Sequence, residues 1–142
     1  MPLWRIYAPA NGYSASEKQK FALDITGIYD AFLPRFYVNV LFHDVAPESF
    51  LVGGEQRSNF VRISIEHIAR TMVDHESKVK FLGHVNEVIA PYVEQRGYDW
   101  ELNVQELPFD LWRVQGLVPP GAESADEKRW KQENKASART HS

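Results

Sequence analysis

Apolar residues follow two different periods along the first part of the chain. A short apolar stretch over residues 3–8 ends at turn residues, which predicts a strand that begins almost at the amino terminus. Apolar residues then recur at intervals of four and three, as on one face of a helix over about residues 15–32: Phe21, Ile25, Ile28 and Phe32. Residues 36–42 are rich in aromatic and β-branched side chains, which predicts a second strand. A strand, a helix and a strand in succession usually form a parallel pair with a right-handed crossover.

The same pattern restarts after a loop at residues 43–58, which contains a possible short hairpin arm at residues 50–52. Residues 60–65 alternate between apolar and polar side chains, which predicts a third strand. A helix is expected over about residues 75–95, loosened near its end by Pro91, with these residues facing inward: Val79, Leu82, Val85, Ile89 and Tyr92. Residues 100–104 form the last expected strand. The pattern therefore predicts an α+β domain at residues 1–120, with β-α-β units at about 1–58 and 59–120.

The composition changes after Pro119 and Pro120, where the chain becomes polar and charged. We expect a charged carboxyl-terminal segment at residues 121–142, with a short helix over about residues 123–134 and a loose tail. The mixture of acidic and basic residues in this segment is most simply the solvated face of that helix.

Composition and charge exclude several classes of function. The chain has 142 residues and no cysteine, so it has neither disulfides, thiol nucleophiles nor cysteine-based metal sites. A net charge of -3 gives no electrostatic basis for general nucleic-acid binding. The first residues do not form a secretory signal, and no apolar run approaches the roughly 20 residues of a membrane helix. We therefore expect a cytoplasmic protein with no nucleic-acid or membrane partner.

Six short segments occur in a characteristic order: Met1-Pro2-Leu3-Trp4, Asp24-Ile25-Thr26-Gly27-Ile28-Tyr29, Val52-Gly53-Gly54-Glu55, Glu66-His67-Ile68-Ala69-Arg70, Gly97-Tyr98-Asp99-Trp100-Glu101, and residues 111–120. Together they resemble the tautomerase superfamily, in particular the fungal form of the cis-3-chloroacrylic acid dehalogenase branch. The resemblance implies a four-stranded mixed sheet with two helices on one face. It also implies a homotrimer that acts on a small carboxylate substrate with no metal and no organic cofactor.

Pro2 is the first candidate catalytic residue. Aminopeptidases remove Met1 readily when the next residue is small, and the product is a secondary amine at the chain terminus. An α-amino group titrates near pH ~8, and burial or nearby cations lower that value towards neutrality, where the amine passes protons in either direction. The alternative is that Met1 stays and Pro2 merely begins a strand.

Two residues are candidates for binding the substrate carboxylate. Arg70 matches the second of two carboxylate-binding arginines in the dehalogenase family, and a guanidinium pairs bidentately with a planar anion. The first family arginine falls near His67 here, so one cation is replaced. His67 either donates a hydrogen bond to the carboxylate, more strongly if protonated, or is a strand-end histidine satisfied by the backbone. Arg5, Arg57 and Arg62 are possible substitutes for the missing cation.

The remaining family positions depart further from the pattern. Tyr29 falls where the family has a histidine that positions water, and its hydroxyl either donates to substrate oxygen or packs on the helix. The helper tyrosine of the family falls near Leu102 or Asn103, so we take Asn103 as a substrate-binding candidate. The water-activating glutamate falls at Val114, and the nearest acids are Asp110 and Glu106.

Three functions therefore stay open. The first is a tautomerase that moves a proton on a small α-keto or enol acid, with Pro2 as acid and base and Tyr29 assisting. The second is a hydratase or dehalogenase of unsaturated three-carbon acids, which needs a positioned base for water. The third is a non-catalytic ligand-binding protein of the same fold. The histidines lack the spacing of a zinc site, so we expect no metal.

Overall fold

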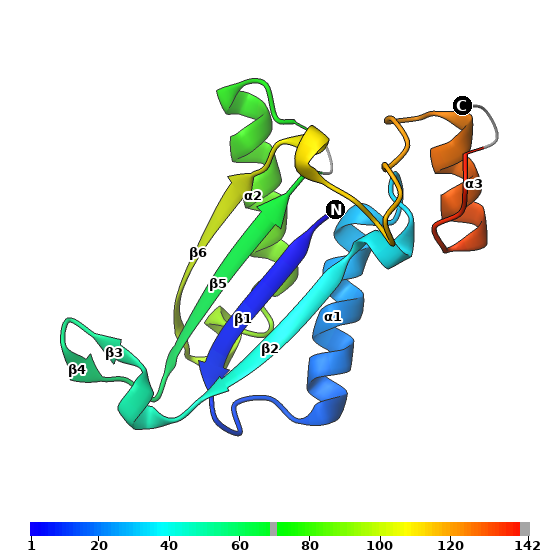
Figure 1. Ribbon diagram of the computed structural model, residues 1–142. Coiled ribbons are helices and arrows are strands. Elements are labelled where there is room, and N and C mark those ends of the chain that lie inside the picture. Colours follow the sequence, from blue (N-terminus) through cyan, green and yellow to red (C-terminus); the bar gives the residue numbers. More distant parts are fainter. Residues whose placement is uncertain (69–70, 140–142) are drawn as a thin grey trace.

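A mixed four-stranded sheet forms the centre of the molecule in the computed structural model, which describes residues 1–68 and 71–139 (Figure 1). The strand order is β2 (Asn39–Val45), β1 (Leu3–Pro9), β5 (Phe60–His67) and β6 (Asp99–Glu106). β1 pairs in parallel with β2, and β5 in parallel with β6, whereas the central strands β1 and β5 are antiparallel. The predicted α+β fold of two β-α-β units is therefore confirmed.

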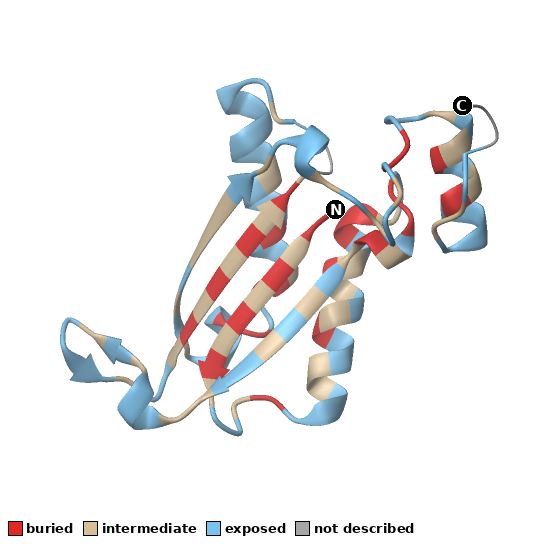
Figure 2. Ribbon diagram, viewed as in Figure 1, coloured by how far each residue is buried: buried red, intermediate tan, exposed pale blue. Residues whose placement is uncertain are grey.

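Two helices, α1 (Ala15–Tyr29) and α2 (His75–Ile89), lie on the same face of this sheet (Figure 1). Alternate residues of the central strands point towards the helices and are fully buried, as the banding along β1 and β5 shows (Figure 2). These residues are Trp4 and Ile6 on β1 and Val61, Ile63 and Ile65 on β5. Because successive strand residues point to opposite faces, the residues between them lie on the face that has no helix.

Local sequence signals fix where the helices begin and end. Ser14 and Glu17 form a capping box at the start of α1, in which the Ser14 hydroxyl accepts from the Glu17 N–H and the Glu17 carboxylate accepts from the Ser14 N–H. α2 ends at Ile89 rather than near residue 95, because Pro91 cannot continue a helix. Gly97 follows with a φ of 76°, a left-handed conformation that favours glycine.

Three details differ from the expected pattern. Phe32 is exposed because α1 ends at Tyr29, which is buried together with Ile28. Val79 and Leu82 are also exposed, since the first half of α2 projects beyond the end of the sheet (Figure 2). β2 begins at Asn39 rather than at residue 36, because a 3-10 turn (Arg35–Tyr37) follows Pro34.

Two smaller elements complete the described chain. Strands β3 (Leu51–Val52) and β4 (Glu55–Gln56) form a hairpin arm that projects away from the main sheet (Figure 1). Helix α3 (Ala125–Glu133) lies at the end of the sheet where β1 begins, and its buried Trp130 packs against the rings of Phe36 and Tyr37. None of the described helices is long and apolar enough to cross a membrane.

Candidate active site

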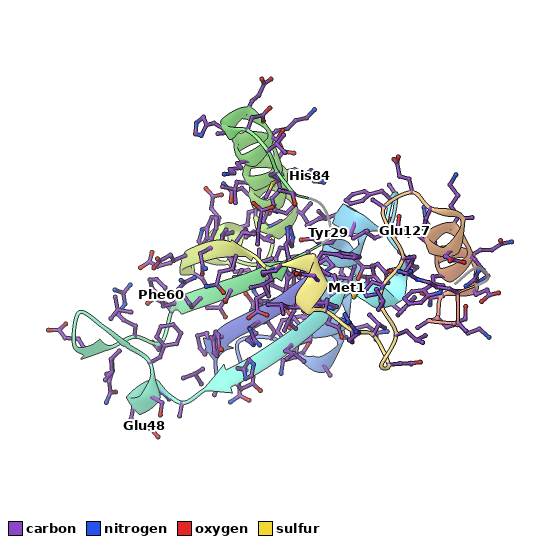
Figure 3. The ribbon with its side chains drawn as sticks, turned by 45° about the horizontal axis from the view of Figure 1, so that its top comes forward. Met1, Tyr29, Glu48, Phe60, His84 and Glu127 are labelled. Atoms are coloured by element: carbon purple, nitrogen blue, oxygen red, sulfur yellow. The ribbon has the colours of Figure 1, made fainter. Side chains whose placement is uncertain are left out.

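The amino terminus is buried at one end of the sheet. β1 is a central strand that begins directly after Pro2, and the Pro2 carbonyl accepts a hydrogen bond from the Asn39 N–H at 2.9 Å. Met1 itself is only 6% exposed. Figure 3 shows Met1, Tyr29 and Glu127 at this end of the molecule, and Phe60 and Glu48 towards the opposite end. The main-chain pairing therefore fixes the start of the chain inside the protein rather than at its surface.

A buried chain of hydrogen bonds joins Trp4, Tyr29 and His67. The Trp4 indole N–H donates to the Tyr29 hydroxyl at 3.1 Å, and that hydroxyl lies 2.6 Å from His67 Nε2. Since the indole is only a donor, the Tyr29 oxygen accepts from it. The hydroxyl hydrogen is then available to His67 Nε2, an arrangement that favours the neutral tautomer with its proton on Nδ1.

Electrostatics keep this pair uncharged near neutral pH. Burial, followed by the positive charge of the amino terminus, lowers the pKa of His67 to about 4, while Glu106 opposes the shift. Burial also raises the pKa of the Tyr29 hydroxyl. His67 ends β5 next to Glu66, which is opposite Leu3 of β1, so the imidazole lies at the same end of the sheet as the amino terminus. A neutral His67 does not replace the cation of the missing arginine.

Met1 and Tyr37 line two cavities at this end of the sheet. The first has a volume of about 310 Å³, and its wall also includes Thr71, Phe109 and Glu127. The second has a volume of about 290 Å³, and its wall also includes Pro2 and Arg113. Because Met1 belongs to both walls, its removal would take away part of the boundary between the two spaces.

Among the residues that the structure describes, the wall of each cavity contains one charged residue, and neither was a candidate from the sequence. Glu127 in the first cavity is 5% exposed, and Arg113 belongs to the second. The spacing of Ser124 and Glu127 matches a capping box and marks the start of a helix, but burial of the carboxylate depends on how α3 packs. Arg113 precedes Val114, the position expected for the family glutamate. The comparison with the family pattern indicated only that a carboxylate is missing there, and it did not identify Arg113.

The candidate site residues from the sequence do not all lie at this end of the sheet. Pro2, Tyr29 and His67 lie together near the amino terminus, whereas Arg70 lies outside the described residues. Asn103 is apart from them, because its side-chain oxygen accepts from Arg62 at 2.8 Å and it belongs to a different cavity.

Each of the proposed substitute arginines already has a partner within the chain. Arg5 pairs with Glu66 at 2.6 Å, Arg57 pairs with Asp99, and Arg62 is bonded to Asn103.

Comparison with known families decides the relationship. A family model described as "Putative oxalocrotonate tautomerase enzyme" matches residues 1–135. The chain belongs to this tautomerase family. None of the curated protein sequences compared with this tautomerase matches it.

Solved structures agree with the family assignment. Native RhCC from Rhodococcus jostii is 45% identical, with a TM-score of 0.93 over 96% of this chain and 99% of RhCC. A protein described as "a probable enzyme" from Aspergillus fumigatus is 42% identical, with a TM-score of 0.92 over 97% of each chain. A member of the cis-3-chloroacrylic acid dehalogenase family shares the fold, with 19% identity and a TM-score of 0.72 over 93% of this chain and 97% of that one. These comparisons establish the tautomerase fold along almost the whole chain.

Proposed function

We propose that this tautomerase moves a proton on a small α-keto or enol carboxylic acid, using the secondary amine of Pro2 after Met1 is removed. The observation that carries the proposal is the position of Met1, which is buried at the start of a central strand and lines two adjacent cavities. Loss of Met1 leaves the Pro2 amine facing the space that the methionine occupied. A substrate that enters this space contacts the charged amine without any rearrangement of the sheet.

The proposed reaction needs one group that both donates and accepts a proton. In the enol-to-keto direction the Pro2 ammonium protonates the enol carbon, and the resulting amine takes the proton from the enol oxygen. The ammonium is thereby restored, and the net change is transfer of one proton from oxygen to carbon. Tyr29 and His67 assist as neutral hydrogen-bonding groups beside the amine, and Arg70 is proposed to hold the substrate carboxylate.

Water addition is less well supported, because it requires a positioned base for the water molecule. Val114, where the family glutamate is expected, belongs to the wall of the Pro2 cavity and has an apolar side chain. The residues around the proposed amine therefore favour proton transfer over hydration or dehalogenation.

Two measurements test the proposal. Intact-mass spectrometry of the native protein should show a chain without Met1, because a retained methionine blocks the amine chemistry. The mature protein should convert phenylenolpyruvate to its keto form, and Pro2→Ala should lower kcat at least about 100-fold without a comparable loss of stability. Pro47→Ala, in the loop between β2 and β3, is the matched control and should keep full activity. Turnover of a haloacrylate alone would favour the dehalogenase, and absence of both activities would favour a ligand-binding protein.

A further inference from the structure

The cavity beside Pro2 combines one cation with an apolar wall. In the part of the chain that the structure describes, Arg113 is the charged residue of this wall. Leu3, Phe36, Trp112 and Val114 contribute apolar side chains to the same wall. Ligand cavities in proteins are mostly apolar, with a few polar groups that fix the orientation of the ligand. This wall therefore suits an acid whose carboxylate meets the cation and whose body is apolar.

Arg113 differs from most other arginines in its surroundings. Five arginines pair with carboxylates: Arg5, Arg35, Arg57, Arg96 and Arg129. Within the described ranges Arg113 has no ion pair, and one of its guanidinium N–H groups donates to the neighbouring carbonyl of Trp112 at 2.7 Å. A guanidinium has five N–H donors, and two of them can bind a planar carboxylate in parallel. The remaining donors of Arg113 therefore suit such a ligand.

A tight turn holds the backbone next to Arg113 in place. Val114 and Leu117 exchange two backbone hydrogen bonds, at 2.9 and 2.8 Å. The two residues between them both have positive φ values, 50° and 78°, as a type I′ turn requires. Trp112 and Val114, on either side of Arg113, pack against the hydrophobic core. Because this segment is already ordered, a ligand that binds to Arg113 pays little entropy to order it.

We propose that Arg113 binds the carboxylate of the substrate and that the apolar wall of the same cavity selects acids with an aryl body. Arg113 acts together with Arg70 on this carboxylate, and it supplies the cation that the neutral His67 does not. The rings of Phe36 and Trp112 suit an aryl group, because aromatic rings pack favourably against one another. This assignment deepens the proposed function and rests on it for the role of the Pro2 amine.

Binding of stable ligands tests the assignment separately from catalysis. Isothermal titration of the mature protein compares 3-phenylpropionate with the uncharged 3-phenylpropanamide. Arg113→Gln should raise the Kd of the acid about tenfold, because a hydrogen bond to a charged group is lost, and should change the Kd of the amide less than about twofold. Arg113→Lys keeps the charge but not the fork, so the Kd of the acid should rise about threefold.

Two further measurements test the aryl preference and the effect on turnover. Propionate has the carboxylate without the ring, and it should bind at least about tenfold more weakly than 3-phenylpropionate. With phenylenolpyruvate as substrate, Arg113→Gln should raise KM more than it lowers kcat, because the carboxylate contact is made in both the ground state and the transition state.

Arg35→Gln is the matched control for loss of one positive charge. Arg35 is exposed, pairs with Asp30 at 3.1 Å and lies outside the described wall of this cavity, so its replacement should change the Kd of the acid less than about twofold. An unchanged Kd in Arg113→Gln, or an equal rise in Arg35→Gln, would overturn the role of Arg113. Equal affinity of the native protein for propionate and 3-phenylpropionate would overturn the aryl preference.

The outcomes also separate this site from the proposed reaction. A loss of acid affinity in Arg113→Gln, with no phenylenolpyruvate turnover by the native protein, would support the binding site and reject the catalytic role of Pro2. An active native protein whose Arg113→Gln variant keeps the same Kd and KM would reject the role of Arg113 and leave that of Pro2 intact.

Discussion

At the scale of single residues, His67 is a buried neutral histidine whose pKa is lowered to about 4. An unfolded histidine has a pKa of about 6.5, so the unfolded chain binds more protons than the folded one between these values. The contribution of neutral His67 to the free energy of unfolding is complete above pH ~6.5. As the pH falls towards 4, the free energy of unfolding decreases by up to roughly 3 kcal/mol. Urea unfolding should therefore show that the free energy of unfolding falls more between pH 7.5 and pH 5 for the native protein than for His67→Gln. Equal losses would contradict the burial of a neutral imidazole.

The Tyr29 hydroxyl links Trp4 to His67, so its removal leaves two buried polar groups without that partner. Tyr29→Phe should lower the free energy of unfolding by about 2 kcal/mol, because the penalty for leaving a buried polar group unsatisfied is about 1–3 kcal/mol. Chemical denaturation measures the change. Tyr7→Phe, on the face of β1 that has no helix, is the control and should cost less than about 0.5 kcal/mol. A similar loss in both variants would contradict a specific role for the buried hydroxyl.

Some residues of the candidate site could be predicted from the sequence, whereas the positions of others depend on how the elements pack. Pro2 stands directly before a strand, and its position is therefore set by the sheet. Glu127 is different, because a capping-box spacing predicts where a helix begins but not which protein surface the helix meets. Arg113 lies in an irregular segment, where no hydrophobic period specifies the direction of a side chain.

At the scale of elements, α3 forms part of the wall of the candidate site. Trp130 is fully buried, and its indole N–H donates to the Ser137 carbonyl at 2.9 Å. Trp130→Ala should cost about 3–5 kcal/mol and detach the helix, because a buried aromatic side chain is removed. Limited proteolysis followed by mass spectrometry should show early cleavage after about residue 120, together with reduced phenylenolpyruvate turnover.

A substitution on the exposed side of the same helix provides the control for this prediction. Gln132→Ala should leave both the protease resistance and the turnover unchanged, since this side chain is exposed. Unchanged protease resistance in Trp130→Ala would show that other contacts hold α3. Cleavage without any loss of turnover would show that the helix is not part of the working site.

The limits of the two long helices show what periodicity can and cannot predict. The β-α-β order followed from the change between helical and strand periods, which depends only on local sequence. The exposure of Val79 and Leu82 did not follow, because the length of sheet beneath α2 is a property of the whole fold. Likewise, the antiparallel pairing of β1 with β5 joins residues about 60 positions apart and has no local signal.

At the scale of the whole molecule, the face of the sheet opposite α1 and α2 is not covered by a helix of the described chain (Figure 1). Leu41 on β2 lies on this face and is 46% exposed. An uncovered sheet face with an apolar side chain is typical of a surface that packs against another subunit. Together with the resemblance to trimeric tautomerases, this surface leads us to propose a homotrimer in which the open faces of three sheets meet.

Sedimentation velocity of the mature protein tests that assembly, and the measured mass should be that of three chains. Leu41→Glu should shift the protein towards single chains, because a carboxylate in a packed interface loses its hydration without gaining a partner. Leu23→Glu is the matched control, since this leucine is 53% exposed on α1, away from the open face, and its replacement should leave the trimer intact. A native protein that sediments as a single chain would contradict the homotrimer. A trimer that survives Leu41→Glu but not Leu23→Glu would place the subunit contact on the helices, so the pair of variants decides which face of the molecule joins the subunits.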